Sequence, residues 1–215
     1  MKRLLLGIVF LLSVVSCGCA QEKAPGQAGQ EPQAPSAVLL DNFEGAISGG
    51  AEGTVDFGAG NGSSVQVSAS TDIMHTGKQS LKAEFDAVSG GYMYIAKGFG
   101  LDAKNAAWLM KPADIDWTKY SALSFYLYGS DSKTQVAVDV KDSGNEIWRF
   151  LVKDDFKGWK QIVCPLKDFF ARGDWQPDNA DKNATMDFPL KSYQFEPLPV
   201  AKGILYFDDV ELIKQ

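Results

Sequence analysis

Four carboxylates stand near the two ends of the region expected to fold, and their type suits the binding of a hard cation. Asp41 and Glu44 lie in or beside the first strand-like segment, and Asp208 and Asp209 lie inside the last one. If these segments pair, their oxygens converge with backbone carbonyls, and calcium takes roughly six to eight such ligands. Two adjacent aspartates in an apolar strand are costly without a partner, which favours a metal over solvated carboxylates. The pattern predicts a structural calcium site.

A second set of side chains combines aromatic rings with planar polar groups. Flat rings cover the apolar faces of sugar rings, planar polar groups bind pairs of hydroxyls, and charged ones give oriented hydrogen bonds. The alternative puts Tyr92 and Tyr94 in the core and makes Asp139 and Arg149 a cross-strand ion pair of little energetic value. Trp108 and Trp175 would rim a cleft or plug the ends of the fold. The candidate ligand-binding residues are Tyr92, Tyr94, Tyr126, Asp139, Arg149 and Gln194, with Tyr193 as an alternative to Gln194.

Residues that enzymes commonly use are scarce in this chain. His75 is the single histidine, so it cannot supply a metal triad or a supported catalytic base. Cys164 lies in a strand-like segment without a nearby base to activate a thiolate, and is expected to be a small buried side chain. A glycosidase needs two carboxylates facing each other across a cleft, and no pair is marked by its surroundings. We expect no catalytic activity, and a hydrolase is the least favoured alternative.

Short segments with a two-residue period must position the candidate residues. Residues 122–128, 134–141 and 147–152 alternate apolar and polar side chains, and Gly-containing polar loops join them, which indicates an antiparallel meander. About ten strands and no long helical period predict an all-β, antiparallel β-sandwich. One helical turn is expected within residues 101–117. The remaining expected strands cover residues 38–44, 54–57, 64–70, 80–87, 92–99, 159–166, 193–198 and 204–213.

The first 36 residues differ in composition from the rest. Lys2 and Arg3 precede an apolar run over residues 4–15, which is too short to span a bilayer and has the layout of a secretory signal. Residues 14–17, Val-Val-Ser-Cys, resemble a bacterial lipobox. This resemblance implies a signal peptide over residues 1–16, a lipid on Cys17 and a place in the cell envelope, at the outer membrane or the cell surface. The alternative is a secreted protein cut near Ala20.

The segment over residues 17–36 is rich in Pro, Gly, Ala and Gln and shows no apolar periodicity. It is expected to be a flexible tether, with the folded domain covering residues 37–215. The net charge of the chain is −6, and no cluster of Lys and Arg occurs beyond residues 2–3. Nucleic acid is therefore not an expected partner.

Five sequence phrases occur in a fixed order along the chain. They are Leu-Asp-Asn-Phe-Glu at 40–44, Thr-Gly-Lys-Gln-Ser-Leu-Lys at 76–82, Asp-Trp-Thr-Lys-Tyr-Ser-Ala-Leu-Ser-Phe at 116–125, Gly-Trp-Lys at 158–160 with Pro-Leu-Lys-Asp-Phe at 165–169, and Tyr-Phe-Asp-Asp-Val-Glu-Leu at 206–212. By these phrases the chain is similar to the galactose-binding-like jelly rolls, most closely the family-eleven carbohydrate-binding modules and the related complex I intermediate-associated domains. The fold alone hosts many functions, so the phrases say more about architecture than about ligand.

The resemblance implies a jelly roll over about residues 38–213. It implies a non-catalytic module that holds a polysaccharide such as a β-glucan on the concave sheet, and the lipobox-like sequence adds that this module is lipid-anchored. It also implies that calcium is held by Glu44, the backbone of Gly77 and Lys78, and Asp208 or Asp209. The likeness to the intermediate-associated domains leaves a second possibility open, in which the partner is a protein and the domain is an interaction or envelope-structural module.

Overall fold

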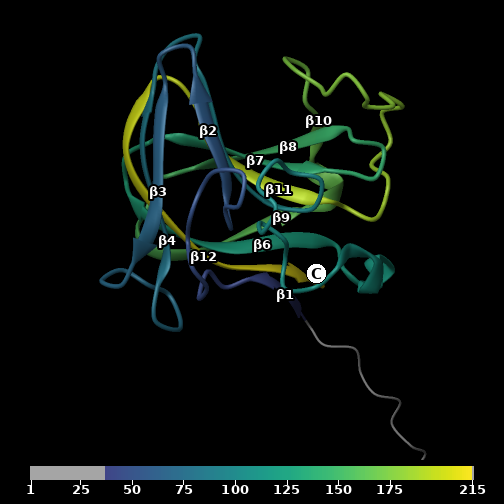
Figure 1. The fold of residues 1–215 in the computed structure, drawn as a ribbon, viewed down its shortest axis with the longest axis horizontal. Helices are drawn as coiled ribbons and strands as arrows, with labels where there is room; N and C mark the ends of the chain where they lie inside the picture. Colours follow the sequence, from purple (N-terminus) through teal and green to yellow (C-terminus); the bar gives the residue numbers. More distant parts are fainter. Residues whose placement is uncertain (1–36, 215) are drawn as a thin grey trace, which may run out of the picture. The chain divides into compact units, whose positions relative to one another are not determined.

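The computed structural model describes residues 37–214, and these form two antiparallel sheets of six strands each that pack face to face (Figure 1). The expected class, an all-β sandwich of jelly-roll type, is therefore confirmed. Sheet A contains β1 (Ala37–Asp41), β3 (Ser64–Ser70), β4 (Ser80–Ala87), β6 (Ala122–Ser130), β9 (Lys157–Pro165) and β12 (Ala201–Ile213). Sheet B contains β2 (Asp56–Gly60), β5 (Tyr92–Gly98), β7 (Gln135–Lys141), β8 (Ile147–Lys153), β10 (Phe170–Ala171) and β11 (Ser192–Pro197). Three 3₁₀ turns are η1 (Pro112–Asp114), η2 (Trp117–Lys119) and η3 (Leu166–Asp168).

The strand order explains how residues far apart in sequence become neighbours. Sheet A runs β3-β4-β12-β6-β9, with β1 also paired to β12, and sheet B runs β10-β8-β7-β11-β5-β2. Ala37 lies opposite Ile213, so the first and last strands pair, which is the condition on which the calcium prediction depends. The predicted signal peptide, the tether and Cys17 lie outside the described residues. Within residues 37–214 no helix has the length and apolar character needed to cross a membrane.

The predicted meander is wrong in one respect. β7 and β8 form a hairpin in sheet B, but β6 pairs with β12 and β9 in sheet A. The chain therefore crosses between the two sheets after β6. A two-residue period says which side chains share a face of one strand, but not which neighbour that strand pairs with.

The core lies between the sheets and is filled by the apolar side of each strand. Phe125 of β6 meets Phe195 of β11 with ring centroids 4.8 Å apart, and Phe195 stacks on Phe207 of β12 at 4.2 Å. Cys164 of β9 is also fully buried there, and burial raises the pKa of its thiol, as expected for an inert side chain. The polar side of sheet B is thus left to face away from the core.

Candidate functional site

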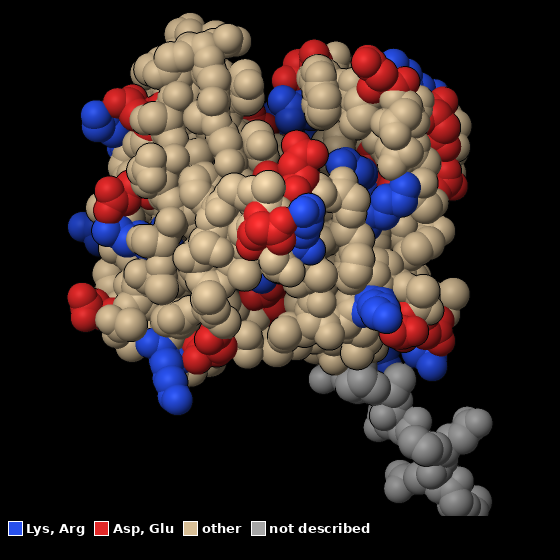
Figure 2. Space-filling model, in the orientation of Figure 1, with Lys and Arg blue, Asp and Glu red and all other residues tan. Residues whose placement is uncertain are grey.

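The face of sheet B that turns away from the core forms the floor of a cleft of about 800 Å³. β5, β11 and β7 supply the floor, β2 closes one side, and the loop that follows β10 closes the other. Figure 2 shows a hollow between a column of mostly uncharged atoms and a region of mixed charge. The cleft therefore has two chemically different sides.

Five of the six predicted ligand-binding residues share this face. Tyr92, Tyr94, Asp139 and Gln194 line the cleft, and Arg149 lies opposite Asp139 in the β7–β8 ladder. The register runs on from Asp139 to Gln194, so residues from separate segments form one row across the sheet. The part that each plays in binding stays a prediction.

The sixth candidate, Tyr126, is not in the cleft. It belongs to β6 in sheet A, and its ring stacks on His75 with centroids 3.4 Å apart. This prediction is wrong for the same reason as the predicted meander. Tyr126 would share a face with Asp139 and Arg149 only if β6 paired with β7, and β6 belongs to the other sheet. His75 lies in the loop between β3 and β4 and packs onto sheet A, where its Nδ1 is 2.8 Å from a carboxylate oxygen of Asp209.

On the first side of the cleft, two tyrosine rings rest on two glycines; we call these four residues the tyrosine wall. Tyr92 pairs with Gly60 and Tyr94 with Gly58 across the β2–β5 ladder. A Cβ atom at Gly60 would lie 2.5–2.6 Å from atoms of the Tyr92 ring, and one at Gly58 would lie 3.0–3.2 Å from Tyr94. Each ring therefore reaches over the neighbouring strand because that strand carries no side chain there. Tyr92 is 50% exposed.

The Tyr94 hydroxyl stays protonated at neutral pH and can donate a hydrogen bond. Burial raises its pKa, and the nearby carboxylates of Asp56 and Asp102 raise it further. Asp56 is itself held in place, because its Oδ2 accepts the backbone N–H of Asp102 at 2.9 Å. This side thus offers ring faces with a neutral hydroxyl.

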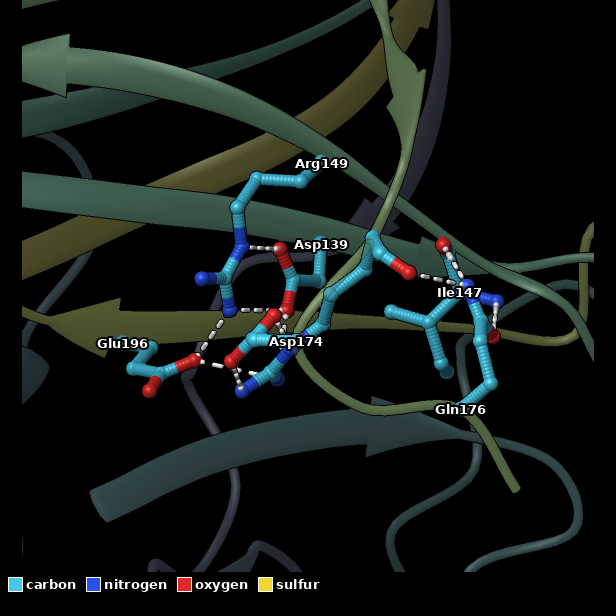
Figure 3. A network of polar contacts seen from close by, with 7 residues as sticks. Asp139, Ile147, Arg149, Asp174, Gln176 and Glu196 are labelled. Carbon is cyan, nitrogen blue, oxygen red and sulfur yellow. Dashed lines mark hydrogen bonds and ion pairs between the residues drawn. The ribbon is translucent and has the colours of Figure 1, made fainter. Parts of the chain in front are cut away.

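The second side is built around five charged side chains, which we call the ion-pair network: Asp139, Arg149, Arg172, Asp174 and Glu196. Arg149 donates two hydrogen bonds of 2.8 Å to Asp139 and a further one to Glu196 (Figure 3). Nη1 of Arg172 lies 3.2 Å from both Asp139 and Glu196. The outer edge of Arg172 donates to Asp174 at 2.8 and 2.9 Å. The charges of this side largely satisfy one another.

The pKa values follow from this packing. Burial works against the charged form of Arg149, but Asp139 and Glu196 outweigh it and raise the pKa. Burial raises the pKa of Glu196, although both arginines oppose the shift. The hydrogen bond from Arg172 lowers the pKa of the more exposed Asp174. Arg149 and Asp139 are thus buried and bound to each other, which limits the hydrogen bonds that they can offer to a ligand.

Two polar side chains of the floor remain free for a ligand. Within residues 37–214, the Gln194 amide and the Lys141 ammonium make no hydrogen bond or ion pair. Burial lowers the pKa of Lys141, and the neighbouring Lys191 adds to this effect. Both residues lie on the cleft face between the two sides, where they can donate to hydroxyls.

Sequence reasoning missed several members of the site. Glu196 could have been found, because it follows Gln194 by two residues and a strand repeats its face with that period. Arg172 lies just beyond the short β10, where periodicity gives no signal. Of the two tryptophans, Trp175 lines the cleft, whereas Trp108 is buried and stacks on Tyr193 at 6.1 Å. Trp175 rims the site and Trp108 plugs the sandwich.

The predicted calcium ligands lie near one another, but their contacts do not fit a metal site. Glu44 accepts the backbone N–H groups of Lys78 and Gln79, so its Oε1 already binds two donors of the loop that was expected to share a cation with it. Asp208 accepts from the backbone of His75, and Asp209 contacts the His75 ring at 2.8 Å. Among residues 37–214 no group of three or more His, Cys, Asp or Glu side chains is arranged to hold a metal. Calcium binding stays a prediction.

Comparison with known proteins identifies related domains. The model of the family described as carbohydrate binding domain (family 11) matches residues 25–215. A family 11 carbohydrate-binding module from Clostridium thermocellum, solved with a β-1,3-1,4-mixed-linked tetrasaccharide, is 21% identical and has a TM-score of 0.63 over 83% of this chain and 95% of that one. A family 30 module from a cellulosomal cellulase of the same organism is 11% identical with a TM-score of 0.52, covering 83% and 98% of the two chains. These two likenesses show the fold.

A curated relative matches a shorter stretch. A mannan endo-1,4-beta-mannosidase of Bifidobacterium adolescentis is 30% identical over 110 residues, which are 51% of this chain and 10% of the enzyme. The chain thus spans about a tenth of that relative, so the activity of the whole enzyme does not transfer.

Proposed function

The chain belongs to the carbohydrate-binding domains of family 11, and from this premise we propose that it holds a neutral polysaccharide of the β-glucan type in the cleft of sheet B without cleaving it. The observation that carries the proposal is the tyrosine wall beside a floor with free donors. Tyr92 and Tyr94 offer ring faces, and Gln194 and Lys141 offer unused hydrogen bonds. A sugar ring needs both, because its apolar face packs on an aromatic ring and its hydroxyls form hydrogen bonds.

The dimensions of the cleft suit a chain of several sugars. From β5 to β10 the sheet order contains four strand-to-strand steps. At about 4.8 Å a step, they span about 19 Å. A glycan lying across the strands would therefore meet the tyrosine wall at one end and Trp175 at the other. The family 11 module that was solved with a mixed-linkage tetrasaccharide makes that glucan the first ligand to test.

The charge of the cleft favours an uncharged ligand. Its lining includes five carboxylates but only two cationic side chains, and Arg149 beneath the floor adds a third cation. A polyanionic glycan would be repelled by this excess of negative charge, whereas a neutral glycan would not. We therefore expect β-glucans to bind and polyuronates to bind weakly or not at all.

Affinity electrophoresis in gels that contain soluble polysaccharides tests the proposal. Wild type and Tyr126→Ala should be retarded by β-glucan, and Tyr94→Ala should be retarded much less. Tyr126→Ala is a matched control, because it removes a tyrosine from the outer face of sheet A. Lack of retardation by every glycan of a broad panel would favour a protein partner instead, and release of reducing sugar would favour a hydrolase.

We further propose that the domain is attached to a membrane through a lipid on Cys17 and works in the cell envelope. The support is the lipobox-like sequence at residues 14–17 with the apolar run before it. Fractionation of cells that produce the full chain tests this. Wild type should pellet with membranes and Cys17→Ala should not; equal distribution of the two would contradict the anchor.

A further inference from the structure

Trp175 stands at the rim of the cleft on an irregular loop, and the residues on both sides of it are anchored. Its side chain is 56% exposed, more than any other tryptophan within residues 37–214. The carboxylate of Asp174, before it, accepts a hydrogen bond from Arg172, and the amide of Gln176, after it, donates one to the backbone carbonyl of Ile147. An exposed ring is thus held by its two neighbours in sequence.

Gln176 binds sheet B through both the oxygen and the nitrogen of its side-chain amide. Its Oε1 accepts the backbone N–H of Ile147 at 2.7 Å, and its Nε2 donates to the carbonyl of Ile147 at 2.8 Å (Figure 3). Nε2 also donates to the carbonyl of Arg172 at 2.9 Å. The side chain therefore acts as one more rung of the ladder and ties the loop to the first residue of β8.

Arg172 holds the other side of Trp175. Its guanidinium donates twice to Asp174 and also reaches the buried Asp139 and Glu196. The guanidinium carbon lies 5.9 Å from the centroid of the Trp175 ring, within the range of a cation–π contact. Asp174 is thereby connected to the floor of the cleft through a single planar group.

We propose that Gln176, Arg172 and Asp174 are positioning residues that fix Trp175 as a stacking surface for a sugar ring at this end of the cleft. The proposal rests on the proposed function, because it assigns one end of the same glycan to Trp175. A free indole would lose rotational freedom when a ligand binds, whereas a fixed one has lost it already. The three residues therefore increase affinity through Trp175, and Gln176 does so without lining the cleft.

Gln176 gives the sharpest test, because it does not line the cleft. Gln176→Ala should weaken β-glucan binding roughly 3- to 5-fold, and Trp175→Ala about 10-fold. In the Trp175→Ala background, Gln176→Ala should have almost no further effect. Gln176→Glu keeps the acceptor for the Ile147 N–H but turns an anionic oxygen toward the carbonyls of Ile147 and Arg172, so its loss should be at least as large as that of Gln176→Ala. Gln161→Ala is the control, since it also removes a hydrogen-bonded glutamine amide but does so in sheet A, where that amide donates to Ser124.

A measurement without glycan separates this proposal from the proposed function. In protein labelled with 5-fluorotryptophan, the Trp175 resonance is assigned by its loss in Trp175→Phe. Gln176→Ala should narrow that resonance and move it toward the value of free tryptophan, while Gln161→Ala should leave it unchanged. An unchanged Trp175 resonance in Gln176→Ala would overturn the positioning role even if glycans bind.

The binding data give the remaining outcomes. If Gln176→Ala weakens binding equally with and without Trp175, the residue acts by another route and the proposal is wrong. If wild type binds no glycan, the proposed function fails and with it the role of Trp175, whatever the fluorine spectra show.

Discussion

The two sides of the cleft position their aromatic side chains in different ways. At the tyrosine wall, Tyr92 and Tyr94 rest on Gly60 and Gly58, and no ion pair takes part. On the opposite side, Trp175 stands on a loop that Gln176 and the ion-pair network tie to the sheet. The first arrangement needs only the absence of two side chains, whereas the second needs several charges in register. We therefore expect the two sides to respond differently to mutation and to pH.

The largest effect should follow from Arg149→Ala, and it should be on stability. Removal of one partner from a buried ion pair leaves Asp139 and Glu196 less compensated, which costs about 3–5 kcal/mol. Urea unfolding measures this loss, with Tyr92→Ala as a comparison that should cost far less because its ring is half exposed. A variant that loses affinity but keeps wild-type stability would show that Arg149 contacts the glycan directly.

Loss of both rings of the tyrosine wall should have the largest effect on affinity. Tyr92→Ala with Tyr94→Ala removes two stacking surfaces, so the dissociation constant for β-glucan should rise on the order of 30-fold or more. Isothermal titration calorimetry gives the value. The pair Tyr126→Ala and Tyr206→Ala, on sheet A, should leave the constant unchanged. Equal losses for the two pairs would remove the distinction between the faces.

Gly60→Ala should act through Tyr92. The new methyl group would occupy the place of the ring, which must lift from β2, and affinity should fall roughly 3- to 10-fold. Gly45→Ala is the control, because a Cβ there meets nothing within 4 Å. In a Tyr92→Ala background the Gly60 substitution should lose its effect. A persistent effect would mean that β2 itself contacts the ligand.

Acid should reduce the contribution of Trp175 to glycan affinity but not that of the tyrosine wall. Burial raises the pKa of Glu196 above its ordinary value of 4.5, so this group takes up a proton at a higher pH in the folded than in the unfolded chain. Through this group alone, the fold gains stability as the pH falls through that window, so weaker binding there would not reflect unfolding. Protonated Glu196 holds Arg172 less firmly, and the ratio of affinities between wild type and Trp175→Ala should shrink about twofold near pH 4.5. An unchanged ratio would show that the charge of Glu196 does not affect the contribution of Trp175 to affinity.

Removal of divalent cations should have the smallest effect. The carboxylates of Glu44 and Asp208 already accept backbone hydrogen bonds, so excess chelator should leave the melting temperature unchanged. A clear fall that calcium restores would support the calcium site that the sequence predicts, and would show that the loop over residues 75–79 rearranges around the ion.

The architecture was predictable from local patterns, and its pairing was not. The alternation in residues 134–141 and 147–152 correctly predicts which side chains of β7 and β8 enter the core between the sheets, although residues on the other side of both strands are buried as well. The same alternation in residues 122–128 is equally clear, yet β6 joins the other sheet and takes Tyr126 with it. Period defines a face within one strand, whereas pairing depends on contacts between segments far apart in the chain.

The candidate site shows the same limit. Tyr94, Asp139 and Gln194 were found because each follows the period of its own strand. Arg172 and Gln176 were not, because they lie in an irregular segment and act through hydrogen bonds to distant residues. The cross-strand ion pair that the alternative interpretation places between Asp139 and Arg149 is present, but it is buried within a larger network that includes Glu196 and Arg172. The pattern within one strand contains no information on such contacts between distant segments.

The central claim is that a glycan lies on the cleft face of sheet B. A titration of isotope-labelled protein with a mixed-linkage β-glucan oligosaccharide, followed by amide and ring NMR shifts, tests it most directly. We predict that the largest shifts fall on Tyr92, Tyr94, Gln194 and Trp175, with Tyr126 and Trp159 unchanged. Shifts centred on Tyr126 and Trp159 on the outer face of sheet A, or no shifts at all, would contradict it.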